Sequence, residues 1–217
     1  MTSSRQIFAP FVCCLLAVLG LFAHQVTSDE TLQVSASHSP LLNSERIRQR
    51  YGNYGIDVLE QDERLRVSNL YSLEEGAKIT RTLAVVLYPA EVPSDITAEH
   101  ELIVAGGSIG QVFKERGWQV EKTVRYLGII PASADFDEIY TLMGGITPAD
   151  LAVLLYDFSV CNASGCFAYT TIAEVYHPDY LGQEDLRAIY GDQAVQPADV
   201  DQTEATLDTV MAVMAGG

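Results

Sequence analysis

The chain has 217 residues, of which 48% are hydrophobic and 19% are charged, and 29 acidic against 13 basic residues give a formal net charge of -16. The hydrophobic content excludes a disordered acidic chain, because such chains lack the apolar residues that build a core. An isoelectric point near 4.4 argues against a nucleic-acid partner and against docking on an anionic membrane, since both need clustered cationic side chains. The length suits one domain with a tail.

The first 28 residues have the pattern of a secretory signal peptide. Arg5 precedes an apolar run over residues 7–23, and small residues at 26–28 offer a cleavage site. The run is slightly short for a membrane span, so a cleaved signal is favoured over the alternative, a retained anchor. This predicts an exported protein, periplasmic or extracellular, without stable membrane insertion after cleavage. A polar linker is expected over residues 29–43.

The remaining chain alternates helical segments with strands that come in pairs. In chain order we predict a basic helix over 43–50, strands over 56–60, 64–71 and 78–88, helices over 94–105 and 109–116, a strand over 118–127, a helix over 133–143, strands over 151–160 and 166–176, and a helix over 183–190. Short loops make hairpins of the second and third strands and of the last two. This order favours an α+β fold, an antiparallel β-sheet with helices packed on one side, for a domain over residues 44–191.

The chain ends in an acidic segment that we interpret as a C-terminal tail, residues 192–217. An amphipathic stretch over residues 203–214 is expected to form a small helix. We expect this helix to pack or to be partly ordered rather than to carry function.

Two cysteines remain after removal of the signal, in the segment Cys-Asn-Ala-Ser-Gly-Cys. In an oxidising compartment, two cysteines that flank a four-residue turn indicate a disulfide, here Cys161–Cys166. A metal site needs further ligands, and none is present in the local sequence, so we predict no metal.

The sequence lacks the common catalytic motifs. It has no Gly-rich phosphate loop with a lysine, no Gly-x-Ser-x-Gly motif and no paired-histidine zinc helix. His100 lies among polar neighbours and is expected to be solvated. His177 follows a strand, where a packing role is more common than catalysis.

Three charged residues stand where the apolar pattern predicts core: Arg66, Arg81 and Glu174. Alternation along residues 166–176 places Ala168, Ile172 and Glu174 on one face of a strand. Such an acid either faces solvent at the strand end or lies in a pocket. Buried charges are costly unless they are paired or bind a ligand, so a pocket with both arginine and glutamate is a functional candidate.

The order of these residues resembles that of the chorismate lyases, which split chorismate into 4-hydroxybenzoate and pyruvate. Arg66 opens a strand that turns through Glu-Glu-Gly to Arg81-Thr82, the segment Gly107-Ser108-Ile109-Gly110 resembles the start of a ligand-binding helix, and residues 171–178 resemble the last strand with its active-site glutamate. The resemblance implies that Arg66, Arg81, Ile109 and Gly110 bind ligand and that Glu174 and Arg66 act in catalysis, without a cofactor.

The chemistry of these residue types is consistent with that implication. An arginine grips a carboxylate through two parallel hydrogen bonds, and a glutamate in an apolar pocket can exchange a proton near neutral pH. Three alternatives follow. The protein binds a small aromatic or cyclic carboxylate, or it is a lyase that releases pyruvate from an enolpyruvyl ether, or it is a structural or interaction protein without a pocket. A pocket that holds Arg66 and Glu174 distinguishes the first two from the third.

Overall fold

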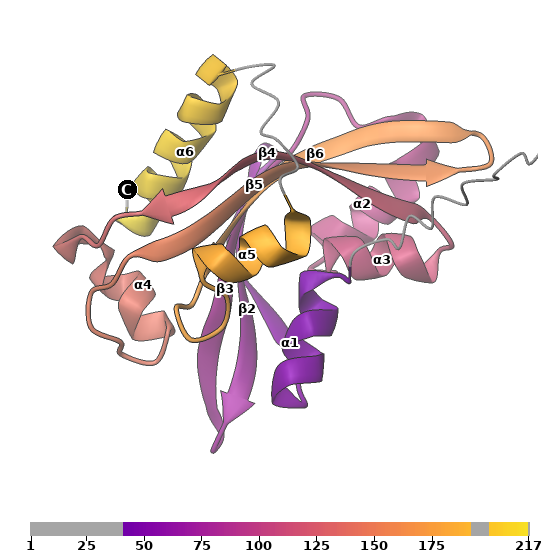
Figure 1. Cartoon of the computed structure of the whole chain (residues 1–217). Helices are drawn as coiled ribbons and strands as arrows, with labels where there is room; N and C mark the ends of the chain where they lie inside the picture. The colour runs from indigo at the N-terminus through magenta and orange to yellow at the C-terminus, as the bar shows by residue number, and fades with distance from the viewer. Residues whose placement is uncertain (1–40, 192–199, 217) are drawn as a thin grey trace, which may run out of the picture. The chain divides into compact units, whose positions relative to one another are not determined.

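The computed structural model describes residues 41–191 and 200–216, and Figure 1 shows the arrangement of its elements. In chain order these are α1 (Asn43–Tyr51), β1 (Gly55–Gln61), β2 (Leu65–Glu74), β3 (Ala77–Leu87), η1 (Ser94–Ile96), α2 (Thr97–Val104), α3 (Ile109–Glu115), β4 (Gln119–Ile130), η2 (Ala134–Phe136), α4 (Asp137–Leu142), β5 (Leu151–Asn162), β6 (Gly165–Tyr176), α5 (Gln183–Tyr190) and α6 (Val200–Met214). The predicted signal peptide at 1–28, most of the linker and residues 192–199 lie outside the described residues.

The strands form one six-stranded sheet in the order β1-β2-β3-β6-β5-β4, and every neighbouring pair is antiparallel. The prediction of an α+β fold with an antiparallel sheet is therefore confirmed, as are both hairpins. The β2–β3 hairpin turns at Glu75 and Gly76, whose φ angles are 51° and 88°. Two positive φ values in a two-residue loop match the right-handed twist of the flanking strands.

The sheet buries both of its faces. Along β3, Ala84 and Val86 point to one face and Leu83 and Val85 to the other, and each set belongs to a separate hydrophobic cluster. The first face, called here the α1 face, is covered by α1, α2, α3 and α5, whereas η2, α4 and α6 pack on the second, called the α6 face. Figure 1 shows α4 and α6 on the side of the sheet away from α1, α2 and α3. The expectation of helices on one side only was therefore wrong.

The C-terminal helix α6 contributes to the packed body of the protein. Its residues Thr206, Val210 and Met214 are buried, and the last two belong to the cluster on the α6 face. Residues 200–214 of the predicted acidic tail thus pack on the sheet, as expected for the amphipathic stretch. Their spacing of four residues places them on one side of the helix.

A β-bulge in β6 changes which side chains share a face. The pairing with β5 shifts so that Thr170 lies opposite Phe158 and Ala168 lies opposite Ser159. The extra residue, Tyr169, packs in the core of the α1 face, and Phe167 packs against the same core, while Ala168 is exposed. Strict alternation was therefore correct for Ile172 and Glu174 and wrong for Ala168, because a bulge reverses the alternation beyond it.

Cys161 and Cys166 form a disulfide across the β5–β6 hairpin. The two cysteines are paired in the register of the strands, directly before and after the turn at Asn162 and Gly165. The pair lies at the tip of the hairpin. The disulfide therefore links two residues that strand pairing already holds side by side.

Replacing both cysteines by serine should lower the free energy of unfolding by about 1–3 kcal/mol, because the disulfide restricts the unfolded chain and a short loop gives a small effect. Urea unfolding of the chain that starts at residue 29 measures this difference. The same chain, unfolded without reductant, should show no free thiol on titration. Two free thiols would refute the bridge.

His177 is a buried residue that ties the end of β6 to its neighbours. Its Nε2–H donates to the Met143 carbonyl at 3.0 Å, and its Nδ1 accepts from the backbone N–H of Asp179 at 3.0 Å. These two bonds require the neutral ring, because a protonated Nδ1 cannot accept. Burial and the positive charge of Arg81 both lower the pKa of His177 from its ordinary value of 6.5. The contacts support the packing role expected from the sequence.

Stability should therefore fall as the pH drops below about 6.5. The unfolded state gains a proton on His177 there, while the lowered pKa in the folded state resists it, so protons favour unfolding. We expect the unfolding free energy of the wild type to decline more between pH 7.5 and pH 5.5 than that of His177→Asn, which cannot titrate. If urea unfolding gives the same pH dependence of the unfolding free energy for both proteins, His177 is not held neutral in the folded state.

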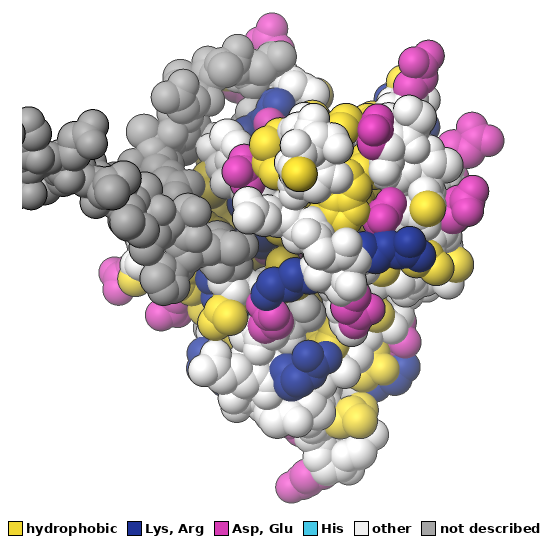
Figure 2. Space-filling model, turned by 90° about the vertical axis from the view of Figure 1, so that its right-hand side faces the viewer, with side chains coloured by type: hydrophobic (Ala, Val, Ile, Leu, Met, Phe, Trp, Pro, Cys, Tyr) yellow, Lys and Arg dark blue, Asp and Glu magenta, His cyan; other side chains and the backbone are white. Residues whose placement is uncertain are grey.

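Charged side chains of both signs are interspersed on the face of the molecule in Figure 2.

Within residues 41–191 and 200–216, none of the helices has both the length and the apolar content required to cross a membrane.

Candidate functional site

A cavity of about 60 Å³ lies on the α1 face of the sheet. All six strands contribute residues to its lining, and residues at the starts of α1 and α3 form its rim. By this measure one water needs about 10–15 Å³. The cavity therefore has room for a few waters or for a small organic group.

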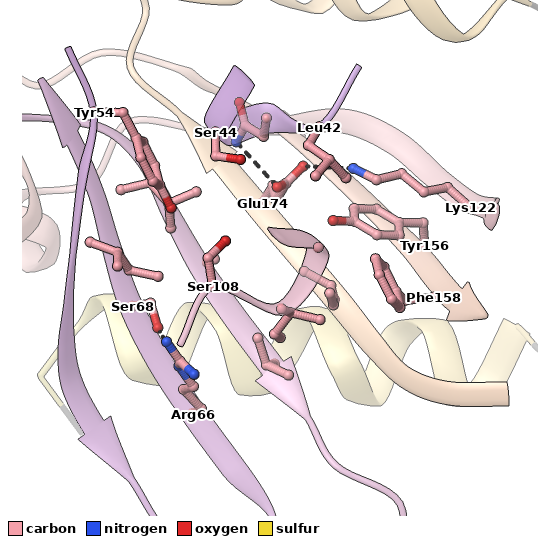
Figure 3. A pocket seen from close by; sticks show the side chains of 18 residues that line it. Leu42, Ser44, Tyr54, Arg66, Ser68, Ser108, Lys122, Tyr156, Phe158 and Glu174 are labelled. Carbon is pink, nitrogen blue, oxygen red and sulfur yellow. Dashed lines mark hydrogen bonds and ion pairs between the residues drawn. The ribbon is translucent and has the colours of Figure 1, made fainter. Parts of the chain in front are cut away.

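The register of the sheet brings Arg66 and Glu174 to the same cavity. Arg66 of β2 pairs with Val86 of β3, and Ala84, two residues earlier on β3, pairs with Glu174 of β6. The two charged residues thus stand two strands apart on one face. Figure 3 shows them toward opposite ends of the cavity, with Ser68 beside Arg66, and with Lys122 and Tyr156 beside Glu174.

Arg66 is a buried cation without a carboxylate partner. Its side chain is fully enclosed, with 1% of the residue exposed. Nε donates to the Ser68 hydroxyl at 2.8 Å, and Nη1 donates to the carbonyls of Ile103 and Gly107 at 2.7 and 3.0 Å. Among the described residues, Nη2 forms no hydrogen bond of good geometry, and no acid lies within ion-pair distance of the guanidinium; the uncharged Tyr88 hydroxyl interacts with the Arg66 side chain. A buried charge in this state is costly unless a ligand compensates it.

Two buried tyrosine hydroxyls, those of Tyr54 and Tyr88, lie near this end. Neither forms a hydrogen bond of good geometry, although the Tyr54 hydroxyl interacts with Ser108 and the Tyr88 hydroxyl interacts with Arg66. Burial raises the pKa of each tyrosine; the contact with Ser108 and the charge of Arg66 oppose this effect for Tyr54, and the charge of Arg66 and the contact with it oppose it for Tyr88. Both hydroxyls therefore keep their protons at neutral pH. Tyr54 lines the cavity, whereas Tyr88 lies outside its lining.

Glu174 is held by polar groups from several elements. Asn43 of α1 donates to Oε1 at 3.1 Å, and the Tyr176 hydroxyl donates to Oε2 at 2.6 Å. The Asn43 amide also donates to Thr82 at 3.0 Å, and its oxygen accepts from the Tyr180 hydroxyl at 2.8 Å. Helix α1 is thereby fixed over the sheet by a network that ends on the carboxylate.

The tyrosines around Glu174 remain protonated. Burial and then the negative charge of Glu174 raise the pKa of Tyr156 and of Tyr176 well above the ordinary value of 10.0. Both hydroxyls therefore serve as donors toward the carboxylate or toward a ligand beside it.

Lys122 of β4 is the second cation of the cavity. Its Nζ lies 3.8 Å from Glu174 Oε2 and 4.1 Å from the centre of the Tyr156 ring. The side chains of Lys122 and Glu174 are 4% and 5% exposed, so this is a buried ion pair. Sequence reasoning missed Lys122. Its signal was the alternation of Val120, Lys122 and Val124, which places a lysine between two buried valines on one face.

The predicted site residues are placed as follows. Arg66, Ile109, Gly110 and Glu174 all line the cavity. At the first turn of α3, a side chain at Gly110 would meet Leu42 Cδ2 at 2.7 Å, so glycine lets Leu42 pack across the rim. This puts four of the five predicted ligand-binding or catalytic residues at one place.

Arg81 does not line the cavity. It is the unpaired residue at a bulge in β3, between Thr80 and Thr82. Its Nε donates to the Ser72 hydroxyl at 2.8 Å, Nη2 pairs with Glu74, and the guanidinium lies 4.0 Å from the centre of the Tyr51 ring. Arg81 thus joins β2, β3 and α1, and its charge has a partner. The expectation that it binds the ligand directly does not agree with this placement.

Compared with known proteins, the chain matches no family model and no curated sequence. The resemblance to chorismate lyases therefore rests on the residues quoted above.

Proposed function

We propose that the protein binds a small aromatic or cyclic carboxylate in the cavity on the α1 face. One observation carries the proposal: Arg66 is buried, has no acidic partner among the described residues, and keeps Nη2 without a hydrogen bond. A carboxylate at this nitrogen supplies both the missing charge and the missing acceptor.

The lining of the cavity is mostly apolar and suits the apolar part of a ligand. Its apolar lining residues include Ile56, Leu70, Val86, Phe158 and Ile172. A cavity with mostly apolar walls and a few polar groups is typical of a small-molecule site. The volume of about 60 Å³ favours a compact acid over an extended one.

The compartment is part of the same proposal. The apolar segment after Arg5 supports export, and the Cys161–Cys166 disulfide supports an oxidising environment. We therefore propose an exported binding protein with a chorismate lyase-like fold.

Calorimetric titration tests the proposal with two matched pairs: benzoate against benzamide, and cyclohexanecarboxylate against its amide. Each amide keeps the shape of the acid and removes the charge. We expect at least one acid to bind and its amide to bind at least about ten-fold more weakly, since a hydrogen bond to a charged group contributes about 1.5–3 kcal/mol. Equal binding of acid and amide would contradict a carboxylate site. No binding of any probe would favour the structural alternative.

A lyase is the second candidate, and the observation that favours it is a buried glutamate in the same cavity. Glu174 lies next to the protonated hydroxyls of Tyr156 and Tyr176. In this alternative the cavity excludes water while an enolpyruvyl ether loses pyruvate. Incubation with chorismate should then release pyruvate, and Glu174→Gln should reduce turnover more than binding, because the amide keeps the shape but exchanges no proton. If the protein binds the acids but releases no pyruvate, the lyase alternative is wrong and the binding function stands.

A further inference from the structure

The ammonium group of Lys122 lies at the cavity, and no described residue accepts a hydrogen bond from it. Its side chain is 4% exposed, and Nζ remains 3.8 Å from Glu174 Oε2, beyond hydrogen-bond distance. The face of the Tyr156 ring lies 4.1 Å from Nζ, measured to the ring centre. An ammonium has three N–H donors. These donors are therefore available to a ligand in the cavity.

Glu174 does not accept a hydrogen bond from Lys122, because the carboxylate oxygen that pairs with it, Oε2, lies 3.8 Å from Nζ. Oε1 accepts from Asn43 at 3.1 Å, and Oε2 accepts from Tyr176 at 2.6 Å. Figure 3 shows the Lys122 side chain extending toward Glu174, with its nitrogen above the Tyr156 ring at the end of the cavity away from Arg66. A ligand that reaches this end meets a donor.

The charges of the cavity decide what kind of acceptor fits. Its charged lining residues are Arg66, Lys122 and Glu174, which are two cations and one anion, with a net charge of plus one. One ligand carboxylate neutralises this charge. A second carboxylate would leave an excess negative charge in a buried site, next to Glu174, which is costly. An uncharged oxygen accepts from Lys122 without that cost.

We propose that the cavity selects a small monocarboxylate with an uncharged acceptor oxygen, such as that of a ketone or an ether, at the end opposite its carboxylate. Lys122 donates a hydrogen bond to this oxygen and thereby determines the specificity. The proposal rests on the proposed function, because it takes Arg66 as the carboxylate site. It adds a specificity residue that lies outside the residues of the lyase resemblance.

Two series of acids of different length test the selection in the wild-type protein. The cyclic series is cyclohexanecarboxylate, 4-oxocyclohexanecarboxylate and cyclohexane-1,4-dicarboxylate, and the linear series is pentanoate, 4-oxopentanoate and glutarate. In at least one series the oxo acid should bind at least about ten-fold more tightly than the plain acid, as expected for a hydrogen bond from a charged donor, and the dicarboxylate should bind more weakly than the oxo acid.

Lys122→Met should remove the advantage of the oxo acid, so that the ratio of its dissociation constant to that of the plain acid approaches one. Lys78→Met is the matched control: this lysine pairs with Asp57 on an exposed part of the sheet, and the ratio should stay as in the wild type. If Lys122→Met does not fold, the wild-type series alone decides.

The outcomes separate the two claims. If no acid of either series binds, or if Arg66→Ala binds the plain acids as well as the wild type does, the proposed function fails. If the acids bind through Arg66 but the oxo acid gains nothing in either series, the dicarboxylate binds best, or Lys122→Met keeps the oxo advantage, then only the selection by Lys122 is wrong.

Discussion

Arg66→Ala should weaken the binding of benzoate by about 1.5–3 kcal/mol, which is about 10- to 150-fold in the dissociation constant. The substitution removes the only cavity cation that has no acidic partner among the described residues. Arg66→Lys should restore part of the affinity, since an ammonium keeps the charge but lacks the planar fork of the guanidinium. Calorimetric titration measures the three affinities under one salt condition.

Arg64→Ala is the matched control for this prediction. Arg64 lies two positions before Arg66, directly ahead of β2, and it is exposed. Its removal changes the net charge of the protein by the same amount and leaves the cavity lining intact. Equal weakening by Arg64→Ala and Arg66→Ala would show a nonspecific charge effect and would contradict a site at Arg66.

Glu174→Gln should lower the free energy of unfolding by about 3 kcal/mol, the lower end of the range for breaking a buried ion pair by removing one partner. The glutamine leaves Lys122 as a buried cation without an anion beside it. The lower end applies because the Tyr156 ring still faces the ammonium and contributes a cation–π interaction. Urea unfolding of the wild type and the variant gives the difference.

A double-mutant cycle shows whether this cost comes from the ion pair. Glu174→Gln combined with Lys122→Met removes both charges, and it should recover most of the loss because no unpaired charge remains. If the two single changes simply add in the double variant, the pair is not coupled, and the electrostatic account of this end of the cavity is wrong.

One residue at each end of the cavity, Arg66 and Glu174, could be proposed from the sequence because each is a charged residue inside a predicted strand. Most residues of both strands are buried, and a buried charge requires a partner or a ligand. The antiparallel sheet also followed from the hairpins. The pairing of β3 with β6 needed the structure, because these strands are distant in sequence and many sheet orders fit the same hairpins.

The errors trace to bulges and to the second face of the sheet. A bulge in β3 places Arg81 beside Tyr51 and Glu74, and a bulge in β6 turns Ala168 out of the core row. An inserted residue leaves little trace in a short alternating pattern. Helices on both sides were missed although β3 and β5 are apolar on both faces, because α6 was interpreted as part of a tail.

Lys122 was overlooked for a different reason. A lone lysine in a strand is usually a solvent-facing residue, and β4 lies at the edge of the sheet, so the two buried valines at 120 and 124 gave only a weak sign that this side chain points inward. The ion pair with Glu174 connects residues from strands β4 and β6, which the sequence order does not place together.

A crystal structure of the protein with bound benzoate would show directly whether Arg66 binds a carboxylate. We expect the carboxylate in the cavity on the α1 face, with one oxygen about 2.7–2.9 Å from Arg66 Nη2, the distance of a charge-assisted hydrogen bond. The ring should contact Val86 and Ile172, which lie between Arg66 and Glu174 in the sheet. Benzoate bound elsewhere, with Nη2 of Arg66 still without a partner, would contradict the account.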